Sequence, residues 1–235
     1  MHWLFGRGAS IACNLTWVVP DDWATYGRDR KVTLVKDAIR SEMDKPYIDT
    51  GVYRQFLELL AEHTANGWRH RFVTTNWDYL LQREIEALQL QVLPPWLANS
   101  HVYHVNGTVE CLPDSSHRSP FLLEDDAPEQ REFTPEANIV YNFMIWDTLF
   151  VVIGMSFECE TDRFLLTALN RVEDDLPIGG SRWVVVNLDP TALEVSSTRI
   201  QRALPGSTVE RVRQTFGDWM EEGIPELQQR GVLTF

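Results

Sequence analysis

The stretch LFVVIGMS, residues 149–156, decides the fold of this chain. Its first five residues are apolar and three of them are β-branched, a pattern typical of a strand that is buried on both faces of a parallel sheet. A glycine and a serine follow directly, as expected for a turn at the carboxyl end of such a strand. The run Trp183–Leu188 has the same character. The sequence therefore predicts central parallel strands at both places.

Working outward, three shorter apolar segments are predicted as strands: His2–Phe5, Arg71–Thr74 and His101–Val105. Amphipathic segments separate them and predict helices. The first has apolar positions over residues 52–60 and a stop at Gly67, and the next are Asp78–Leu88, Thr161–Val172, a segment capped by Asp189 with Pro190 in its first turn, and a last one beginning near Asp218. This alternation predicts an α/β fold with a doubly wound, mostly parallel, Rossmann-like sheet flanked by helices. We expect one domain over residues 1–235, with helical or loop excursions near 12–50 and 111–135.

The charge balance argues against nucleic-acid binding. The 235 residues include 21 Lys and Arg against 34 Asp and Glu, which gives a net charge of −13. Proteins that track a phosphate backbone draw their affinity from Lys and Arg, so we expect no direct contact with nucleic acid. A small anionic ligand remains compatible, because backbone N–H groups can hold it locally.

Metal and membrane sites are not expected either. Three cysteines, Cys13, Cys111 and Cys159, form no C-x-x-C pair, which excludes a four-thiolate zinc site. The histidines also lack metal-site spacing. No apolar run approaches about 18 residues, so we expect no membrane span. The first residues lack the basic start and long apolar stretch of a secretory signal, and we expect a cytoplasmic protein.

The residues that follow the predicted strands form the candidate site, because a doubly wound sheet binds ligands beyond the carboxyl ends of its strands. Small or hydrogen-bonding residues follow all five strands: Gly6-Arg7-Gly8-Ala9-Ser10, Thr74-Thr75-Asn76-Trp77-Asp78, Asn106-Gly107-Thr108, Gly154-Met155-Ser156, and Asn187 with Asp189. Taken alone, the first motif also fits a tight turn, and the second fits a helix start capped by Asn76 or Asp78. The fingerprint G-x-G-x-x-G is incomplete because Ile11 replaces its third glycine, which disfavours a hydride-transferring dehydrogenase.

Together these motifs resemble the sirtuin-like NAD-binding fold, in particular its zinc-free bacterial branch, whose members are typically NAD+ hydrolases in antiviral defence. The matching pieces are the loop Gly6–Ser10, the segment Thr74–Asp78, Val105-Asn106-Gly107, Gly154–Ser156 with the downstream Asp162, Asn187 after a strand, and Gly217-Asp218 near the end. The resemblance spans nearly the whole chain, and the Thr-Thr-Asn-x-Asp segment is its most specific part. The missing cysteine pairs agree with the zinc-free branch and disagree with protein deacylases, which usually carry a zinc module.

The resemblance implies a role for each matched residue, with NAD as substrate or ligand and no metal. Gly6, Gly8, Ala9 and Ser10 would line the pyrophosphate and the nicotinamide-side ribose, and Asn76 and Asp78 would lie where the glycosidic bond breaks. Gly154 and Ser156 would contact the phosphate and adenosine ribose, Asn187 would meet the adenosine ribose, and Gly217 with Asp218 would lie near the adenine. Thr75 and Met155 are expected to bind the cofactor as well. Arg7 replaces the usual small residue between the glycines. It could reach a phosphate as a bidentate donor or point to solvent.

The pattern breaks where the family has its catalytic histidine, because Asn106 occupies that position. Asparagine has no nitrogen that titrates near pH 7 and cannot act as a general base. His104 could substitute, since residues two apart face the same side of a strand, but it would lie about 6–7 Å away along the strand. A hydrogen-bonded histidine in the sheet wall is the other interpretation. Whether Asn106 is natural or introduced stays open.

Two hypotheses follow from these residues. The first is an NAD+ hydrolase of the defence type, which cleaves the nicotinamide–ribose bond to nicotinamide and ADP-ribose. Its candidate catalytic residues are Asn76, Asp78, Asn106 and His104. The second is a catalytically silent subunit that binds NAD or ADP-ribose, or serves as a scaffold, and acts through a partner protein or a homo-oligomer.

Overall fold

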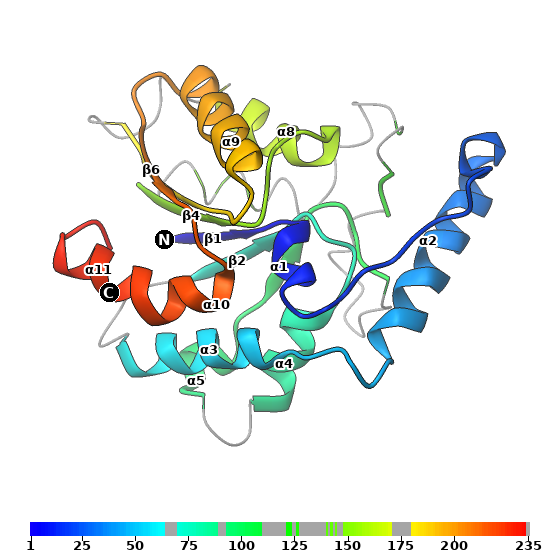
Figure 1. Ribbon diagram of the computed structural model, residues 1–235, viewed down its shortest axis with the longest axis horizontal. Helices are drawn as coiled ribbons and strands as arrows, with labels where there is room; N and C mark the ends of the chain where they lie inside the picture. The colour runs from blue at the N-terminus through cyan, green and yellow to red at the C-terminus, as the bar shows by residue number, and fades with distance from the viewer. Residues whose placement is uncertain are drawn as a thin grey trace.

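The computed structural model describes residues 1–63, 70–88, 93–109, 121–123, 126, 140, 142, 144, 148–170 and 180–233. It confirms the predicted α/β architecture. Six parallel strands form one sheet in the order β3-β2-β1-β4-β5-β6, with helices on both faces (Figure 1). The strands are β1 His2–Phe5, β2 Arg71–Thr74, β3 Val102–His104, β4 Leu149–Ile153, β5 Arg182–Val186 and β6 Thr208–Val212.

The first, second and fourth strands have the predicted bounds, and two others differ slightly. Strand β3 is one residue shorter at each end than predicted, and β5 begins at Arg182 and ends at Val186. The sequence analysis missed β6 altogether. Within the described part of the chain this strand pairs with β5 alone, and its central Glu210 and Arg211 form ion pairs with Arg230 and Glu194, respectively. An edge strand with polar side chains lacks the apolar run that marks a buried strand.

The helices cover both faces of the sheet. They are α1 Arg7–Ile11, α2 Arg28–Met43, α3 Gly51–His63, α4 Leu80–Leu88, α5 Pro95–Ala98, α8 Glu160–Asn170, α9 Pro190–Ala203, α10 Phe216–Asp218 and α11 Ile224–Gln229, with a 3-10 turn at Trp23–Thr25 and a π-turn at Trp219–Gly223. Helices α8 and α9 lie on one face, and α3, α4 and α10 lie on the other (Figure 1). Among the described residues, none of the helices combines the length and the apolar character that a bilayer crossing requires.

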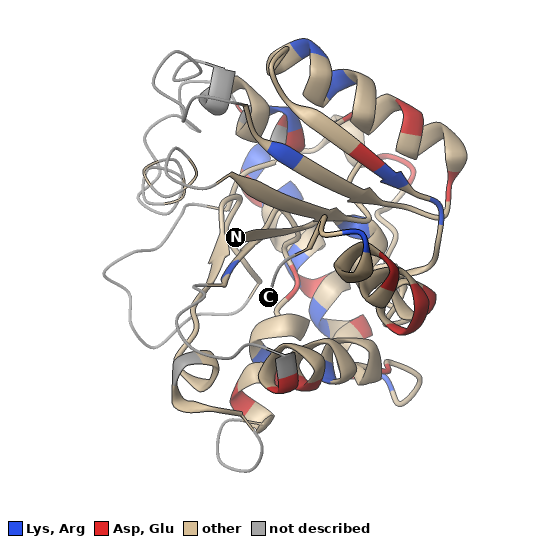
Figure 2. Ribbon diagram, turned by 90° about the vertical axis from the view of Figure 1, so that its left-hand side faces the viewer, with Lys and Arg blue, Asp and Glu red and all other residues tan. Residues whose placement is uncertain are grey.

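Alternate side chains of the central strands build two separate cores. Trp3 and Phe5 belong to the core beneath α3 and α10, whereas Leu4 belongs to the core beneath α8 and α9. This is the consequence of the two-residue period of a strand that is covered on both faces. Charged residues lie mainly on the helices and on the edge strand β6, and β1 and β4 carry none (Figure 2).

Most predicted helix boundaries are confirmed to within two residues. Asp189 caps α9 by accepting from the Thr191 N–H at 2.8 Å, as predicted. The helix predicted from Asp78 begins at Leu80, because the Asp78 carboxylate accepts from the Leu80 N–H. The excursion near 12–50 contains the 3-10 turn and α2. Of the excursion near 111–135, only residues 121–123 and 126 are described, and Cys111 lies outside the described residues. The predicted helix ends at Gly67 and at residues 171–172 also lie outside them.

Candidate functional site

The described residues form two cavities at the carboxyl ends of the strands, one on each side of helix α1. The first, which we call the β5 cavity, has a volume of about 380 Å³ and is lined by α1, the ends of β4 and β5, and the turn after β6. The second, the β2 cavity, has a volume of about 240 Å³ and is lined by α1, the loop after β2, and residues before and within α8. Strands β1 and β4 are neighbours here, where the strand order reverses. This is the point at which doubly wound sheets bind ligands.

Backbone packed against backbone separates the two cavities. The Gly8 N–H donates to the Gly154 carbonyl at 2.8 Å. Gly154 has a φ of +64°, and a Cβ built on it would lie 2.5 Å from the nitrogen of Ala9 and 2.6 Å from the Cα of Gly8. Only glycine tolerates both this conformation and this approach. Both glycines line the β5 cavity.

The glycine loop differs in one respect from the expected phosphate cradle. The Gly8 N–H is bonded to Gly154, and the Ala9 N–H donates to the Gly6 carbonyl at 3.0 Å. These two groups are therefore occupied within the protein. The loop brings the two cavities close together, and the N–H groups of Gly8 and Ala9 are not free for a phosphate.

A directed chain of hydrogen bonds lies in the β2 cavity. The Asn76 amide donates to the Gly6 carbonyl at 2.9 Å and to the Ser10 hydroxyl at 2.7 Å, and Ser10 donates to Asp78 at 2.5 Å. The Gly6 carbonyl can only accept, so this network sets the orientation of the Asn76 amide. Both amide protons are thereby used. The Oδ1 atom of Asn76 is left as an acceptor, with no hydrogen bond to any described residue, in a side chain that lines the cavity.

Asp78 accepts the last hydrogen bond of this network, from Ser10. Its side chain is buried, and burial raises the pKa of its carboxyl group, opposed by the hydrogen bonds from Ser10 and Leu80. Sequence reasoning left open whether Asp78 caps the helix or belongs to the site. The structure shows that one oxygen caps α4 while the other accepts from Ser10, in a side chain that lines the β2 cavity. Its part in a functional site stays a prediction.

Aromatic rings form another wall of the β2 cavity. Trp77 packs against Trp17 with ring centroids 5.7 Å apart, and the Arg7 guanidinium lies 5.4 Å above the Trp17 ring. All three residues line the cavity. Arg7 therefore lines the cavity while its side chain stays exposed, and its contact with a phosphate stays a prediction.

The β5 cavity combines polar strand ends with exposed apolar side chains. Asn187 lines it, as predicted, and its Oδ1 atom accepts from the Asp189 N–H at 3.1 Å. Ile11 and Leu188 also line it and are 48% and 58% exposed. Sequence reasoning assigned neither to the site, because an isolated apolar residue carries no motif.

Several predicted site residues do not line either cavity. Gly6, Ala9, Met155, Ser156, Gly217 and Asp218 are in this group. The Ala9 and Met155 side chains are buried in the two cores. At the turn after β6, the cavity is lined by Gln214, Thr215 and Phe216. Thr215 is the cap of α10, and its hydroxyl accepts from the Asp218 N–H. A threonine cap three residues before an aspartate was a signal that could have pointed to this turn.

Asn106 and His104 lie behind the loop after β2. The Asn106 amide donates to the Thr75 carbonyl at 3.0 Å, and the ring Nδ1 of His104 lies 3.4 Å from the Asn76 carbonyl. Both side chains are 3% exposed, and neither lines a described cavity. Burial lowers the pKa of His104 to about 4. The placement agrees with the interpretation of His104 as a hydrogen-bonded histidine in the sheet wall.

Two buried histidines predict acid sensitivity. Burial lowers the pKa of His70 and of His104 to about 4, and Nδ1 of His70 accepts from the Trp3 indole at 2.9 Å. The unfolded chain, with a histidine pKa of about 6.5, binds more protons than the folded one between these values. The contribution of each histidine to the free energy of unfolding is therefore fully present above pH 6.5. It is lost as the pH falls towards 4, by at most about 3 kcal/mol for each histidine. Urea unfolding from pH 7.5 to 4 checks this. His104→Gln should flatten the profile, whereas His101→Gln, at an exposed position whose charge adds only to the lowering of the His104 pKa, should change it much less.

Comparison with known proteins identifies the fold. No protein-family model and no curated protein sequence matches the chain. Solved structures do match, and three of them cover 99% of this chain and 93% of their own. They are a structure on the mechanism and regulation of Sir2 enzymes (TM-score 0.54, 15% identity), Sir2 bound to an acetylated peptide (0.51, 14%) and a structure on sirtuin substrate affinity (0.50, 13%). The chain therefore has a sirtuin-like fold, as its motifs predicted. The described residues contain no group of three or more His, Cys, Asp or Glu side chains that could hold a metal ion.

Proposed function

We propose that this chain binds NAD as a substrate across both cavities and cleaves the bond between nicotinamide and ribose, releasing nicotinamide and ADP-ribose. The observation that carries the proposal is the pair of cavities that meet at the Gly8–Gly154 contact, with the Asn76–Ser10–Asp78 network in one of them. A dinucleotide is an extended ligand with two ring systems joined by a pyrophosphate. Two pockets with a close backbone crossing between them suit that shape.

The two ends of the ligand are assigned by the chemistry of the cavities. The larger β5 cavity would take the adenosine, because Ile11 and Leu188 offer apolar surface to a planar base and Asn187 lies beside it. The β2 cavity would take the nicotinamide and its ribose beside Asn76. Arg7 would then lie near the pyrophosphate as a cationic partner.

Bond cleavage would occur in the β2 cavity. The C1′–N bond breaks, its electron pair stays with the departing nicotinamide nitrogen, and the oxygen of water bonds to C1′. Asn76 Oδ1 would accept a hydrogen bond from that water or from a ribose hydroxyl. Asp78 would take up the released proton, since burial raises the pKa of its carboxyl group.

A second candidate, a catalytically silent binding subunit, is favoured by one specific observation. Among the described residues that line either cavity, none is a histidine. Asn106 replaces the family's histidine and holds the Thr75 carbonyl. His104 is buried with a lowered pKa. A chain of this kind could hold NAD or ADP-ribose and act through a partner protein or a homo-oligomer.

One experiment separates these candidates. Nicotinamide release from NAD+ is measured for the chain with Asn106 and for Asn106→His, and binding of NAD+ and ADP-ribose is measured by calorimetry. Release by both proteins supports a hydrolase that does not need a histidine at position 106. Release by the His variant alone supports a silent subunit on a competent scaffold. Binding without release by either protein also supports the silent subunit. Failure of both proteins to bind either ligand rejects the whole proposal.

The apolar rim of the β5 cavity provides a prediction for binding. Leu188→Asp should weaken the binding of ADP-ribose about tenfold, because it removes apolar contact and adds a negative charge beside an anionic ligand. The stability should hardly change, since Leu188 is 58% exposed. Val18→Asp is the matched control, because Val18 is 85% exposed and lines neither described cavity. Equal affinities of the two variants would contradict the adenosine assignment.

The antiviral role expected from the resemblance is part of the same proposal. It predicts that cellular NAD falls when a bacterial host that produces the chain meets a virus, and that Asn76→Ala abolishes this fall. Light scattering of the purified chain determines whether a homo-oligomer forms.

A further inference from the structure

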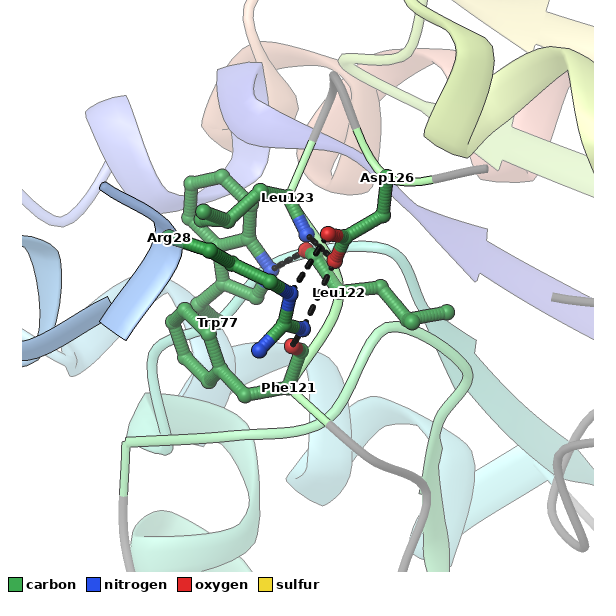
Figure 3. Close-up of polar contacts among 6 residues, drawn as sticks. All are labelled: Arg28, Trp77, Phe121, Leu122, Leu123 and Asp126. Atoms are coloured by element: carbon green, nitrogen blue, oxygen red, sulfur yellow. Dashed lines mark hydrogen bonds and ion pairs between the residues drawn. The ribbon is translucent and has the colours of Figure 1, made fainter. Parts of the chain in front are cut away.

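A short part of the chain lies against helix α2 and Trp77, and we call it the strap: Phe121, Leu122, Leu123 and Asp126. Arg28, at the start of α2, holds it in place (Figure 3). Its Nε and Nη2 atoms donate to the two Asp126 oxygens at 2.6 and 2.8 Å, and Nη2 also donates to the Phe121 carbonyl at 2.7 Å. The Asp126 side chain is 5% exposed. This bidentate pair thus joins segments 98 residues apart, with a geometry that adds strength and direction.

The strap holds the Trp77 side chain from one side. The Trp77 indole N–H donates to the Leu122 carbonyl at 3.0 Å, and the Phe121 ring stacks on Trp77 with centroids 5.3 Å apart (Figure 3). Trp17 packs against the same indole at 5.7 Å. The Trp77 carbonyl accepts from the Val109 N–H at 2.8 Å. Trp77 is therefore fixed through its backbone, its indole nitrogen and its ring.

The strap is also tied to the loop after β2. The Leu122 N–H donates to the Asn106 carbonyl at 2.9 Å, while the Asn106 amide donates to Thr75. Thr75 and Trp77 both line the β2 cavity. Movement of the strap would therefore be transmitted to that wall of the cavity.

We propose that the strap determines the size of the reactants that the β2 cavity admits. With Trp77 fixed, the cavity takes a nicotinamide-sized group and water, and it excludes a larger acceptor such as a peptide side chain. The identity of these reactants rests on the proposed function. The size limit itself does not, because it follows from the clamp on Trp77.

Cys159 provides a reporter that needs no substrate. It lines the β2 cavity and is half-buried. Cys13 is 0% exposed, and burial raises the pKa of its thiol, so it should stay unreactive in the folded chain. Cys111 is replaced by serine throughout. The alkylation rate of Cys159 is measured with iodoacetamide and with a bulky fluorescein maleimide.

The bulky reagent should react with Cys159 far more slowly, relative to iodoacetamide, than it does with a free thiol. In Arg28→Ala its relative rate should rise roughly tenfold, as expected when a charge-assisted hydrogen bond that holds a closed state is removed. Arg30→Ala is the matched control, because Arg30 lies over the Tyr26 ring at 4.3 Å and no described contact joins it to the strap. Labelling of Cys13 would reveal a variant that has simply unfolded.

Phe121→Ala provides a second variant that leaves the ion pair intact and removes the ring stacked on Trp77. It should give the same rise as Arg28→Ala. Unrestricted reaction of the bulky reagent with the chain that carries only Cys111→Ser would overturn the proposal. Tryptophan fluorescence shows whether Arg28→Ala and Phe121→Ala move Trp77. If they do, and the folded variants still give an unchanged relative rate for the bulky reagent, the proposal is also overturned. Either result leaves the NAD proposal standing, whereas loss of NAD binding with size restriction intact rejects only the proposed function.

Discussion

Asn76→Ala is expected to lower the rate of nicotinamide release by at least about 100-fold while the chain stays folded. The side chain holds Gly6 and Ser10 through its amide nitrogen, and its oxygen is the acceptor left for the reacting water or ribose. Alanine removes the acceptor and also the hydrogen bond that Asn76 donates to Ser10, which orients the Ser10 hydroxyl towards Asp78. The binding of NAD should weaken by less than about tenfold, because the β5 cavity stays intact.

The measurement is nicotinamide release by chromatography, with affinity measured separately by calorimetry. Asn99→Ala is the matched control, because Asn99 is exposed and its amide bonds only the Pro95 carbonyl among the described residues. If the chain with Asn106 releases no nicotinamide, the comparison is made in the Asn106→His background. Undiminished release by Asn76→Ala would show that another group orients the reacting atoms.

Gly154→Ala is expected to abolish dinucleotide binding and to destabilise the fold. The added Cβ would lie 2.5 Å from the Ala9 nitrogen, at a φ of +64° that side chains rarely adopt. The backbone conformation alone costs about 1–3 kcal/mol, and the forced separation from Gly8 adds to that. Because this contact separates the two cavities, we expect the affinity for NAD and ADP-ribose to fall by more than about 100-fold.

Gly231→Ala measures the cost of the backbone conformation alone, so its comparison with Gly154→Ala gives the steric part of the effect. Gly231 has a φ of +67°, and nothing lies within 4 Å of a Cβ built on it. It should cost about 1 kcal/mol in urea unfolding and leave binding unchanged. If both variants lost the same stability and neither lost affinity, the Gly8–Gly154 contact would have no part in ligand binding.

The sequence predicted the parts of the fold that depend on local pattern. Leu149–Ile153 is apolar throughout, because a central parallel strand is covered on both faces, and it was found with its predicted bounds. Asp189 followed by Pro190 marked the start of α9 for the same local reason. The edge strand β6 was missed because it is half-covered and polar, so no apolar run marks it.

The candidate site was predictable only in part. Glycines and polar residues after the strands could be placed at one edge of the sheet, and Arg7, Ser10, Thr75, Asn76 and Asp78 do line one cavity together. Ile11 and Leu188 were not predictable, because an exposed apolar side chain gains meaning only from the cavity beside it. Arg28 and Asp126 were likewise not predictable as partners, since 98 residues separate them.

The sequence by itself determined the α/β class, the central strands and the sirtuin-like motifs, because each depends on residues that are close together along the chain. Only the tertiary structure decided that Asn106 holds the Thr75 backbone and that the strap holds Trp77. It also decided that the Gly8 N–H is bonded to Gly154. The physical reason is that hydrogen-bond partners are chosen in space. The same asparagine, glycine or tryptophan can serve a ligand or the fold, depending on which group the packed chain brings beside it.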